Sequence, residues 1–356
     1  MDNPKYISEE ILQFARDSEE LEGFTYDLNN ISTDSDNLMK DISKDVVVEF
    51  LKCPDTKIMV VKNIAGDYEV LAHNLVANET VRIKDMGNHF MALVRVGEEV
   101  NDYKKRKETD PNTPLIRNNF PENFPKDFAE RFSNEYSSDF IKEVNEQLLL
   151  HRYGEIGIGD YRTIDFTGRP VDVMIADNID GRLVNKNIKL ERSANGNVVL
   201  KMKELIDWVN DEGFKDNDPE KILENVAKFH SRFIEIHPFR DGNGRTARLL
   251  TNYLLMAKDM PLINIPAKDR KDYIDALNYS ILPEDAKLDG DYTVFCEKMR
   301  HTYGDKNDEN KFFPLRDFFA DHLLPNSNEL VEEIIDYKGG TDSRKMSAEQ
   351  VEGFAK

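Results

Sequence analysis

Apolar side chains recur every three or four residues along much of the second half of the chain, a spacing that places them on one face of an α-helix. The stretch 127–150 shows this pattern, and so do 202–212 and 219–236. Further amphipathic stretches follow at 249–255, 269–277, 292–302, 312–324 and 329–337. The pattern therefore predicts a mainly α fold.

The helix expected at 219–236 has clear end signals. Asp218 can cap its first turn, and Pro219 fits the first helical position. Pro238 disfavours helical geometry at the preceding residue, so the helix should end at His237. His230 lies near the buried face of this helix, where we expect a hydrogen-bonded core histidine rather than a ligand.

A shorter amphipathic helix is expected at residues 8–22, near the N-terminal end. Ser8 can cap it, and Gly23 suits the position just past its end. Its apolar face would consist of Ile11, Phe14, Ala15 and Leu21. Ser18 and Glu22 lie on the same face. The helix should therefore pack against something that is polar, and preferably cationic, at this end.

Residues 57–97 have a different character, because short β-favouring runs alternate there with polar breaks. The runs are 57–62, 68–73, 80–84 and 90–96. They predict a small antiparallel β-rich insert, in which His73 and His89 are structural or surface residues rather than ligands. Residues 98–125 are polar and proline-containing, which favours a linker across the surface.

Two β-hairpins are candidates between residues 163 and 202. In the first, β-favouring residues from Ile164 to Ile175 flank the turn Thr167–Pro170. In the second, residues 188–190 and 198–200 flank Asn195-Gly196, a strong hairpin turn signal. The sequence does not choose between them.

Composition narrows the function classes. The 356 residues carry a formal charge of −20 with a pI of about 4.9, which argues against a broad surface for nucleic acid or anionic membranes. Cys53 and Cys296 lie far apart and have no metal-site spacing, which fits a reduced, cytoplasmic setting. Neither a signal segment nor an apolar run of membrane-spanning length is evident, so no membrane partner is expected.

The candidate chemistry is concentrated in residues 237–248, which read His-Pro-Phe-Arg-Asp-Gly-Asn-Gly-Arg-Thr-Ala-Arg and lead into an amphipathic helix. The amide groups of a helix N-terminus attract anions, and the guanidinium groups of Arg245 and Arg248 suit phosphate oxygens. Asp241 is an oxygen ligand of the kind that holds Mg²⁺ beside substrate phosphates. His237 can act as a general base near neutral pH. The stretch therefore predicts a nucleotide phosphate–Mg²⁺ site.

The same residues resemble a known family. The pattern His-x-Phe-x-Asp-Gly-Asn-Gly-Arg-x-x-Arg at 237–248 is similar to the complete motif of the Fic family of AMP-transferring enzymes. Gly159-x-Tyr161-Arg162 resembles the segment that often opens the Fic core. Ser18-x-x-x-Glu22-Gly23 resembles the inhibitory motif of the Fic class whose own N-terminal helix blocks the site.

The resemblance implies a mainly α, Fic-type helical bundle with a β-hairpin flap, which would hold the target protein by strand addition. We accordingly expect four parts. They are an inhibitory helix at 1–24, a β-rich insert and linker at 25–124, a catalytic core at 125–302, and a C-terminal helical or loosely ordered tail at 303–356. Fic proteins often form dimers, so a homodimer is consistent with the family.

By the same resemblance, the chain would be an ATP-dependent protein adenylyltransferase. His237 would accept the proton of a Tyr, Thr or Ser hydroxyl in a target protein while that hydroxyl attacks the α-phosphorus of ATP. Asp241 would hold Mg²⁺. The phosphates would be bound by Gly242, Asn243, Gly244, Arg245 and Arg248. Pairing of Glu22 with Arg248, supported by Ser18 and Gly23, would keep ATP in an unproductive position.

Three other functions remain open on sequence grounds. One relative of the family transfers the γ-phosphate instead and has a lysine where Gly244 stands, so Gly244 argues against phosphoryl transfer. Removal of AMP from target proteins would use the same residues, with Glu22 orienting a water molecule. A nucleotide-binding regulator without turnover is the third alternative, although such a protein has no need of the base His237.

Overall fold

The structure is a computed structural model of the chain. It describes residues 13–15, 17–18, 21–22, 40–42, 56–62, 68–74, 79–120, 138–149, 159–161, 175–179, 182–186, 198–239, 241–283, 290–324, 327, 330, 332, 334 and 341–342. The strands are described by their backbone. Several predictions fall outside these residues, among them Gly23, the hairpin turn at 167–170 and the environment of Cys53.

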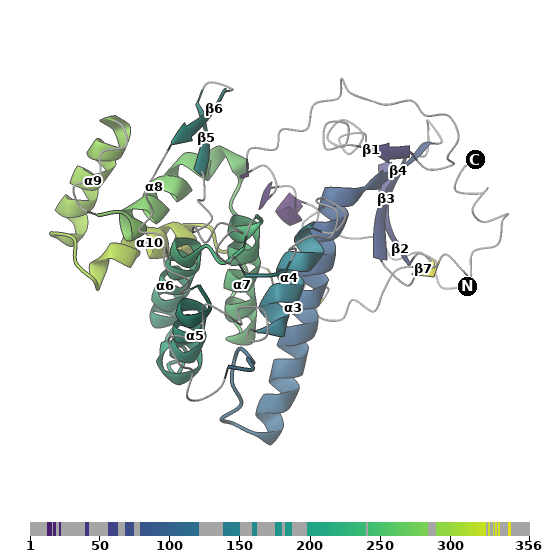
Figure 1. The fold of residues 1–356 in the computed structure, drawn as a ribbon, viewed down its shortest axis with the longest axis horizontal. Coiled ribbons are helices and arrows are strands. Elements are labelled where there is room, and N and C mark those ends of the chain that lie inside the picture. Colours follow the sequence, from purple (N-terminus) through teal and green to yellow (C-terminus); the bar gives the residue numbers. More distant parts are fainter. Residues whose placement is uncertain are drawn as a thin grey trace, which may run out of the picture.

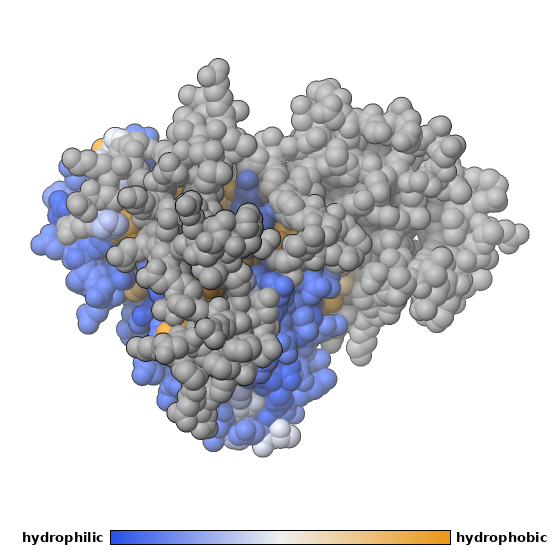
Figure 2. All heavy atoms as spheres, viewed as in Figure 1, coloured by the Kyte–Doolittle hydropathy of each residue, from blue (hydrophilic) through white to orange (hydrophobic). Residues whose placement is uncertain are grey.

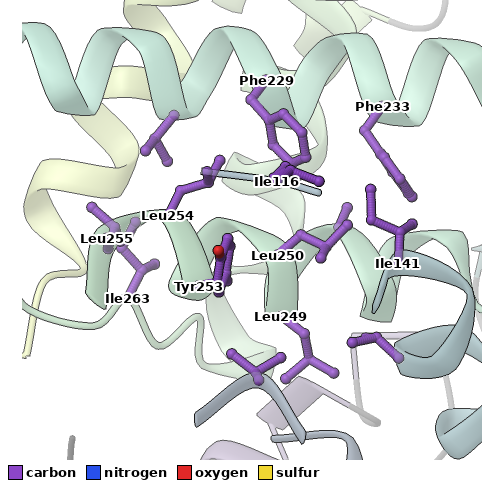
Figure 3. Close-up of a cluster of buried hydrophobic side chains, with 14 of the residues drawn as sticks. Ile116, Ile141, Phe229, Phe233, Leu249, Leu250, Tyr253, Leu254, Leu255 and Ile263 are labelled. Atoms are coloured by element: carbon purple, nitrogen blue, oxygen red, sulfur yellow. The ribbon is translucent and has the colours of Figure 1, made fainter. Parts of the chain in front are cut away.

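The centre of the molecule is helix α7 (Asn243–Ala257), against which α6 (Pro219–Ile236), α4 (Asp139–Leu149) and α3 (Lys84–Thr109) all pack (Figure 1). Almost every residue of α7 is buried, as expected for a helix that neighbours cover on all sides. Figure 3 shows the core formed by these helices. Phe229 and Phe233 of α6 and Ile141 of α4 face the leucines of α7.

The remaining helices complete a mainly α fold. Helix α5 (Val198–Trp208) runs into a π-helical turn, η1 (Val209–Gly213), before α6. Helices α8 (Arg270–Ile281) and α10 (Phe313–Asp321) pack against α6, and α9 (Gly290–Tyr303) follows α8. Two short 3₁₀ turns are η2 (Ala267–Asp269) and η3 (Asn310–Phe312). On the face shown in Figure 2, the described residues at the surface are largely hydrophilic.

Two sheets are described. The larger has the order β1-β4-β3-β2-β7 and lies beside the N-terminal end of α3 in Figure 1. Its strands are β1 (Lys40–Ile42), β2 (Thr56–Lys62), β3 (Tyr68–Asn74), β4 (Glu79–Ile83) and β7 (Thr341–Asp342). The β2–β3 and β3–β4 pairs are antiparallel, whereas β1–β4 and β2–β7 are parallel. The second sheet is the antiparallel pair β5 (Ile175–Ile179) and β6 (Arg182–Lys186).

One strand prediction and part of the linker prediction are wrong. Residues 90–96 and 98–109 belong to the single helix α3. The apolar residues of this segment recur with helical spacing, and its buried face consists of Phe90, Leu93, Val96, Val100 and Tyr103. The polar residues that suggested a linker form i,i+4 ion pairs instead, such as Arg95–Glu99 and Arg106–Asp102. The domain boundary at residue 125 stays a prediction.

The observed hairpin is neither of the two candidates. Strands β5 and β6 flank Asp180-Gly181 in the sequence, a strong turn signal that lies between the two proposed turns. Residues 198–200, expected as a strand after Asn195-Gly196, form the first turn of α5 instead. Val198 and Val199 are buried there, because the helix directs both into the core. Packing therefore overrides the strand preference of valine.

The ends of α6 and the role of His230 are confirmed. The Asp218 side chain accepts hydrogen bonds from the first-turn amides of α6, Pro219 opens the helix, and His237 ends it. His230 is fully buried, with hydrogen bonds between its Nδ1 and Thr251 Oγ1 at 2.9 Å and between its Nε2 and the Tyr273 hydroxyl at 2.7 Å. Burial is the main cause that lowers the pKa of His230 to about 3.

This pKa predicts an acid sensitivity that belongs to one residue. The unfolded imidazole takes up a proton below about pH 6.5, whereas the folded one stays neutral until about pH 3. The contribution of neutral His230 to the free energy of unfolding is therefore complete above about pH 6.5. It is lost progressively as the pH falls below that value. Between pH 6 and 4, we expect the unfolding free energy of the wild type to fall by about 1.4 kcal/mol per pH unit more than that of His230→Gln in urea titrations. If the unfolding free energies of the two proteins fell equally with pH, His230 would not be the source of the acid sensitivity.

Candidate functional site

The site is built on the loop that joins α6 to α7. His237 has φ 50° and ψ 59°, in the left-handed region, and its amide donates to the Phe233 carbonyl at 2.9 Å. Gly242, which immediately precedes α7, has φ 75°. Left-handed geometry is uncommon for a residue with a side chain. The short loop from α6 to α7 thus has a left-handed position at the end of α6 and another directly before α7.

Asn243 holds the loop from inside. Its Oδ1 accepts from the Phe239 amide and its Nδ2 donates to the Phe239 carbonyl, both at 2.9 Å. Phe239 is buried against the rings of Tyr161 and Phe233, so its ring packs under the loop. The Asn243 side chain is thus used within the loop. A contact of this residue with phosphate would therefore be made by its backbone amide.

A residue that the sequence did not single out ties the loop to α4. The buried side chain of Asn145 donates to the Asp241 carbonyl at 3.0 Å and to Thr246 Oγ1 at 3.2 Å. Its Oδ1 accepts from the amide of Gly159 at 3.3 Å. The position of Asn145 inside the apolar face of the 127–150 stretch could have indicated this role. A buried side-chain amide needs hydrogen-bond partners, which other elements must supply.

The imidazole of His237 is oriented by its own helix. Its Nδ1 lies 3.3 Å from the Ile234 carbonyl oxygen, which can only accept. A neutral imidazole therefore carries its proton on Nδ1 and donates it there, which leaves Nε2 as the proton-accepting nitrogen. This tautomer is the one that a general base at the loop requires.

The Asp241 carboxylate lies at the edge of the helix N-terminus. Its Oδ1 accepts from the Gly242 amide at 2.7 Å, Oδ2 lies 3.8 Å from Arg245 Nη2, and 41% of the side chain is exposed. Mg²⁺ is usually held by one or two carboxylates together with substrate phosphates and water. One accessible carboxylate at an anion-binding helix end fits this ion. Within the described residues, no cluster of three or more His, Cys, Asp or Glu side chains could hold a metal.

The two arginines differ in their surroundings. Arg245 is almost fully buried beside Asp241, at 1% exposure. The guanidinium of Arg248 meets the N-terminal segment: Nε donates to Ser18 Oγ at 2.9 Å, and Nη2 donates to the Ser18 carbonyl at 2.7 Å and to Glu22 Oε1 at 2.9 Å. The structure therefore brings Ser18 and Glu22, more than 200 residues away in sequence, onto the last arginine of the loop motif.

The N-terminal segment is docked by more than this arginine. Residues 13–15 and 17–18 are helical, and Phe14 and Leu21 are buried in the core. Asn264 donates to the Asp17 carboxylate at 2.7 Å, and Arg270 Nε donates to the Leu21 carbonyl at 2.7 Å. Phe14 and Leu21, from the apolar stripe expected for this helix, line one small cavity with residues of α7, and the polar end of the helix lies on a cation as predicted.

The Glu22 carboxylate also lies directly over Gly244, in the first turn of α7. A Cβ atom on Gly244 would overlap Glu22 Oε1. The Glu22 carboxylate is thus an anion placed at the N-terminus of α7, where the backbone amides attract negative charge. A larger side chain at this position would therefore displace the Glu22 carboxylate.

This contact predicts the effect of Gly244→Ala. The added methyl group should displace Glu22 and loosen the docked segment, because overpacking costs about 1–3 kcal/mol. We expect hydrogen exchange of peptides that cover residues 13–22 to become about tenfold faster or more, since exchange reports local opening. Gly290→Ala is the matched control, because a Cβ there meets nothing within 4 Å. Unchanged protection in Gly244→Ala would contradict the docked geometry.

Three comparisons with known proteins bear on this site. The model of the Fic/DOC family matches residues 135–255. Protein adenylyltransferase fic-1 of Caenorhabditis elegans is 39% identical over 85 residues, which are 24% of this chain and 16% of that protein. Protein adenylyltransferase Fic of Nematostella vectensis is 43% identical over 79 residues, which are 22% of this chain and 17% of that protein.

A crystal structure of a Fic domain containing signaling protein from Bacteroides thetaiotaomicron is 20% identical, with a TM-score of 0.47, and the alignment covers 92% of this chain and 88% of that one. No helix within the described residues has the length and apolar character needed to cross a membrane. The curated relatives are matched over about a sixth of their length. The family match includes His237, Asp241 and Arg248, and residues 135–255 therefore form a domain of the Fic/DOC family.

Proposed function

We propose that this chain is a protein adenylyltransferase that moves AMP from ATP to a hydroxyl side chain of a target protein. The observation that carries the proposal is that one short loop of a Fic/DOC domain joins His237, at the end of α6, to the N-terminus of α7. The relatives named above, which are matched across the domain, are called protein adenylyltransferases. That name supports the reaction type.

His237 is the general base in this proposal. Nε2 accepts the proton of the target hydroxyl, whose oxygen forms a bond to the α-phosphorus of ATP. The bond from the α-phosphorus to the bridging oxygen breaks, and pyrophosphate leaves. Because Nδ1 is oriented toward the Ile234 carbonyl, the imidazole keeps its orientation through the transfer and stabilises the proton it has gained.

The N-terminus of α7 binds the phosphates. The first amides of a helix lack intrahelical partners and attract negative charge as it develops on the phosphate oxygens. Arg248 binds the γ-phosphate, and Arg245, beside Asp241, adds positive charge at the β- and γ-phosphates. Asp241 would hold Mg²⁺, which neutralises phosphate charge when bound.

The docked N-terminal segment is an inhibitory element in this proposal. Ser18 and Glu22 take three N–H groups of Arg248, and these are the donors that the γ-phosphate needs. A carboxylate next to Gly244 also repels the phosphates from the α7 amides. ATP then binds in an unproductive position until the segment leaves. Gly23, beyond the described residues, stays a predicted part of this motif.

The β5–β6 hairpin is the flap in this proposal. It lies within the segment where a flap is expected, and Figure 1 shows it projecting away from the helices. An open edge of such a pair can add an extended segment of a target protein as a further strand, through backbone hydrogen bonds. A protein target, rather than a small molecule, is the substrate that this mode of binding suits.

The position of the transferred label tests the function. Glu22→Gly protein would be incubated with Mg²⁺ and ATP labelled on the α-phosphate, and in parallel with ATP labelled on the γ-phosphate. We expect α-label on the chain itself or on a lysate protein, and none from the γ-phosphate. Label from the γ-phosphate would indicate a phosphotransferase. Loss of label from a pre-adenylylated target would indicate AMP removal, and ATP binding without either transfer would indicate a regulator.

A further inference from the structure

One buried side chain joins three segments beside the loop motif. Asn145, in α4, is 1% exposed, and its Nδ2 donates to the Asp241 carbonyl at 3.0 Å and to Thr246 Oγ1 at 3.2 Å. Its Oδ1 accepts from the Gly159 amide at 3.3 Å. A backbone carbonyl can only accept and a backbone amide can only donate. The orientation of the Asn145 amide is therefore fixed by its partners.

The hydrogen bond to Asp241 holds one whole peptide group. The Asp241 carbonyl and the Gly242 amide belong to the same peptide unit, which is planar and trans. Asn145 binds the oxygen of this unit, and the N–H on its opposite side donates to the Asp241 carboxylate at 2.7 Å. Asn145 and the carboxylate are thus attached to opposite sides of one rigid group. Rotation of the peptide would break both hydrogen bonds together.

Glycine at position 242 allows Asn145 to approach this closely. Gly242 has φ 75°, and a Cβ atom there would lie 3.0 Å from Asn145 Nδ2, which is closer than ordinary van der Waals contact. Thr246, which also binds Asn145, donates its own amide to the Gly242 carbonyl at 2.8 Å. Asn145 therefore holds α7 at two points, the peptide just before the helix and a side chain in its first turn.

The acceptor end of Asn145 holds residues 159–161 against the same loop. Gly159 donates to its Oδ1, and the ring of Tyr161 packs on the ring of Phe239 with centroids 5.4 Å apart. Residues 159–161 precede the β5–β6 hairpin in the sequence. The side chain of Asn145 is thus a junction of α4, the segment that leads toward the hairpin, and the loop that carries Asp241.

We propose that Asn145 is a positioning residue that fixes the Asp241 carboxylate relative to the first amides of α7. The proposal rests on the proposed function, in which Asp241 holds Mg²⁺ and these amides bind the phosphates. Groups that orient a metal-binding side chain typically change metal affinity or activity about 10- to 100-fold when they are lost. Loss of Asn145 should therefore weaken the binding of ATP with Mg²⁺ more than the binding of ATP alone.

The test is Asn145→Leu, with Asn210→Leu as a matched control. Leucine has the branching of asparagine but makes no side-chain hydrogen bond. Asn210, in η1, is also a clamp on distant backbone, because it makes two hydrogen bonds with Ile116, both of 2.9 Å. In the Glu22→Gly protein, we expect Asn145→Leu to lower the calorimetric affinity for ATP about tenfold with Mg²⁺ and by less than about twofold with EDTA. Asn210→Leu should change neither affinity.

A second measurement uses the same proteins without nucleotide or Mg²⁺. Peptides that cover residues 241–246 should exchange hydrogen about tenfold faster in Asn145→Leu, because the hydrogen bonds that hold this loop are lost. Peptides from α10 should exchange as they do in the parent protein. The comparison separates a loosened loop from a general loss of stability, which would speed exchange in both places.

Faster loop exchange together with the Mg²⁺-selective loss of affinity would support the proposal. Equal losses of affinity with Mg²⁺ and with EDTA, or unchanged loop exchange, would overturn it. Both measurements are independent of AMP transfer, so a parent protein that transfers no label would count against the proposed function alone. Asn145→Ala removes the same hydrogen bonds, and the same two measurements on it decide the question if Asn145→Leu does not fold.

Discussion

Glu22→Gly is expected to raise the rate of AMP transfer by about 10- to 100-fold over the wild type, measured as initial incorporation of α-label. The Glu22 carboxylate accepts from Arg248 Nη2 at 2.9 Å, and the arginine side chain is only 7% exposed. A hydrogen bond between charged groups contributes about 1.5–3 kcal/mol. This energy sets the expected range of the rate increase, about 10- to 100-fold. Glycine removes the contact and the negative charge over Gly244 together.

Two graded variants separate charge from shape. Glu22→Gln keeps the size of the side chain but loses its charge, so it should activate less than glycine does. Ser18→Ala removes the acceptor of Arg248 Nε and should also activate weakly, because the Ser18 carbonyl and Glu22 remain. A wild type that already transfers AMP as fast as Glu22→Gly would show that the docked segment does not inhibit under those conditions.

The loop motif was predictable because its chemistry is local in sequence. Pro238 ends α6 at His237, and Gly242 takes a left-handed φ immediately before α7. These are backbone rules that single residues enforce. The pairing of Glu22 with Arg248 is not local, and it was reached through the resemblance of Ser18-x-x-x-Glu22-Gly23 to a family motif. The helix spacing alone indicated that this face needed a cation.

Other features were missed because tertiary contacts decide them. Residues 90–96 are rich in β-favouring side chains, yet α7 and α4 offer a long apolar surface that a helix from 84 to 109 can cover. Glu99 is buried there among Arg95, Arg106 and Arg117, of which only the first two lie in its own helix. Asn145 acquires its role by contact with residues about 100 positions away. Spacing along the chain does not reveal such partners.

His237→Asn in the Glu22→Gly background is expected to lower the AMP transfer rate by about 10²–10⁴-fold, which is the usual contribution of a general base. Asparagine is the informative replacement because the position has φ 50°. Asparagine tolerates left-handed geometry far better than alanine does, so the loop should keep its shape. The amide side chain cannot accept the proton of a target hydroxyl at neutral pH.

The affinity for Mg²⁺-ATP distinguishes a lost base from a distorted loop. The phosphates are bound by the α7 amides and the arginines in this proposal, so calorimetric affinity should change by less than about threefold in His237→Asn, the variation expected of a site whose contacts are kept. His301→Asn, on the exposed face of α9, is the matched control and should leave both rate and affinity unchanged. A parallel loss of ATP binding would mean that His237 shapes the loop. An unchanged transfer rate with intact binding would mean that another group accepts the proton.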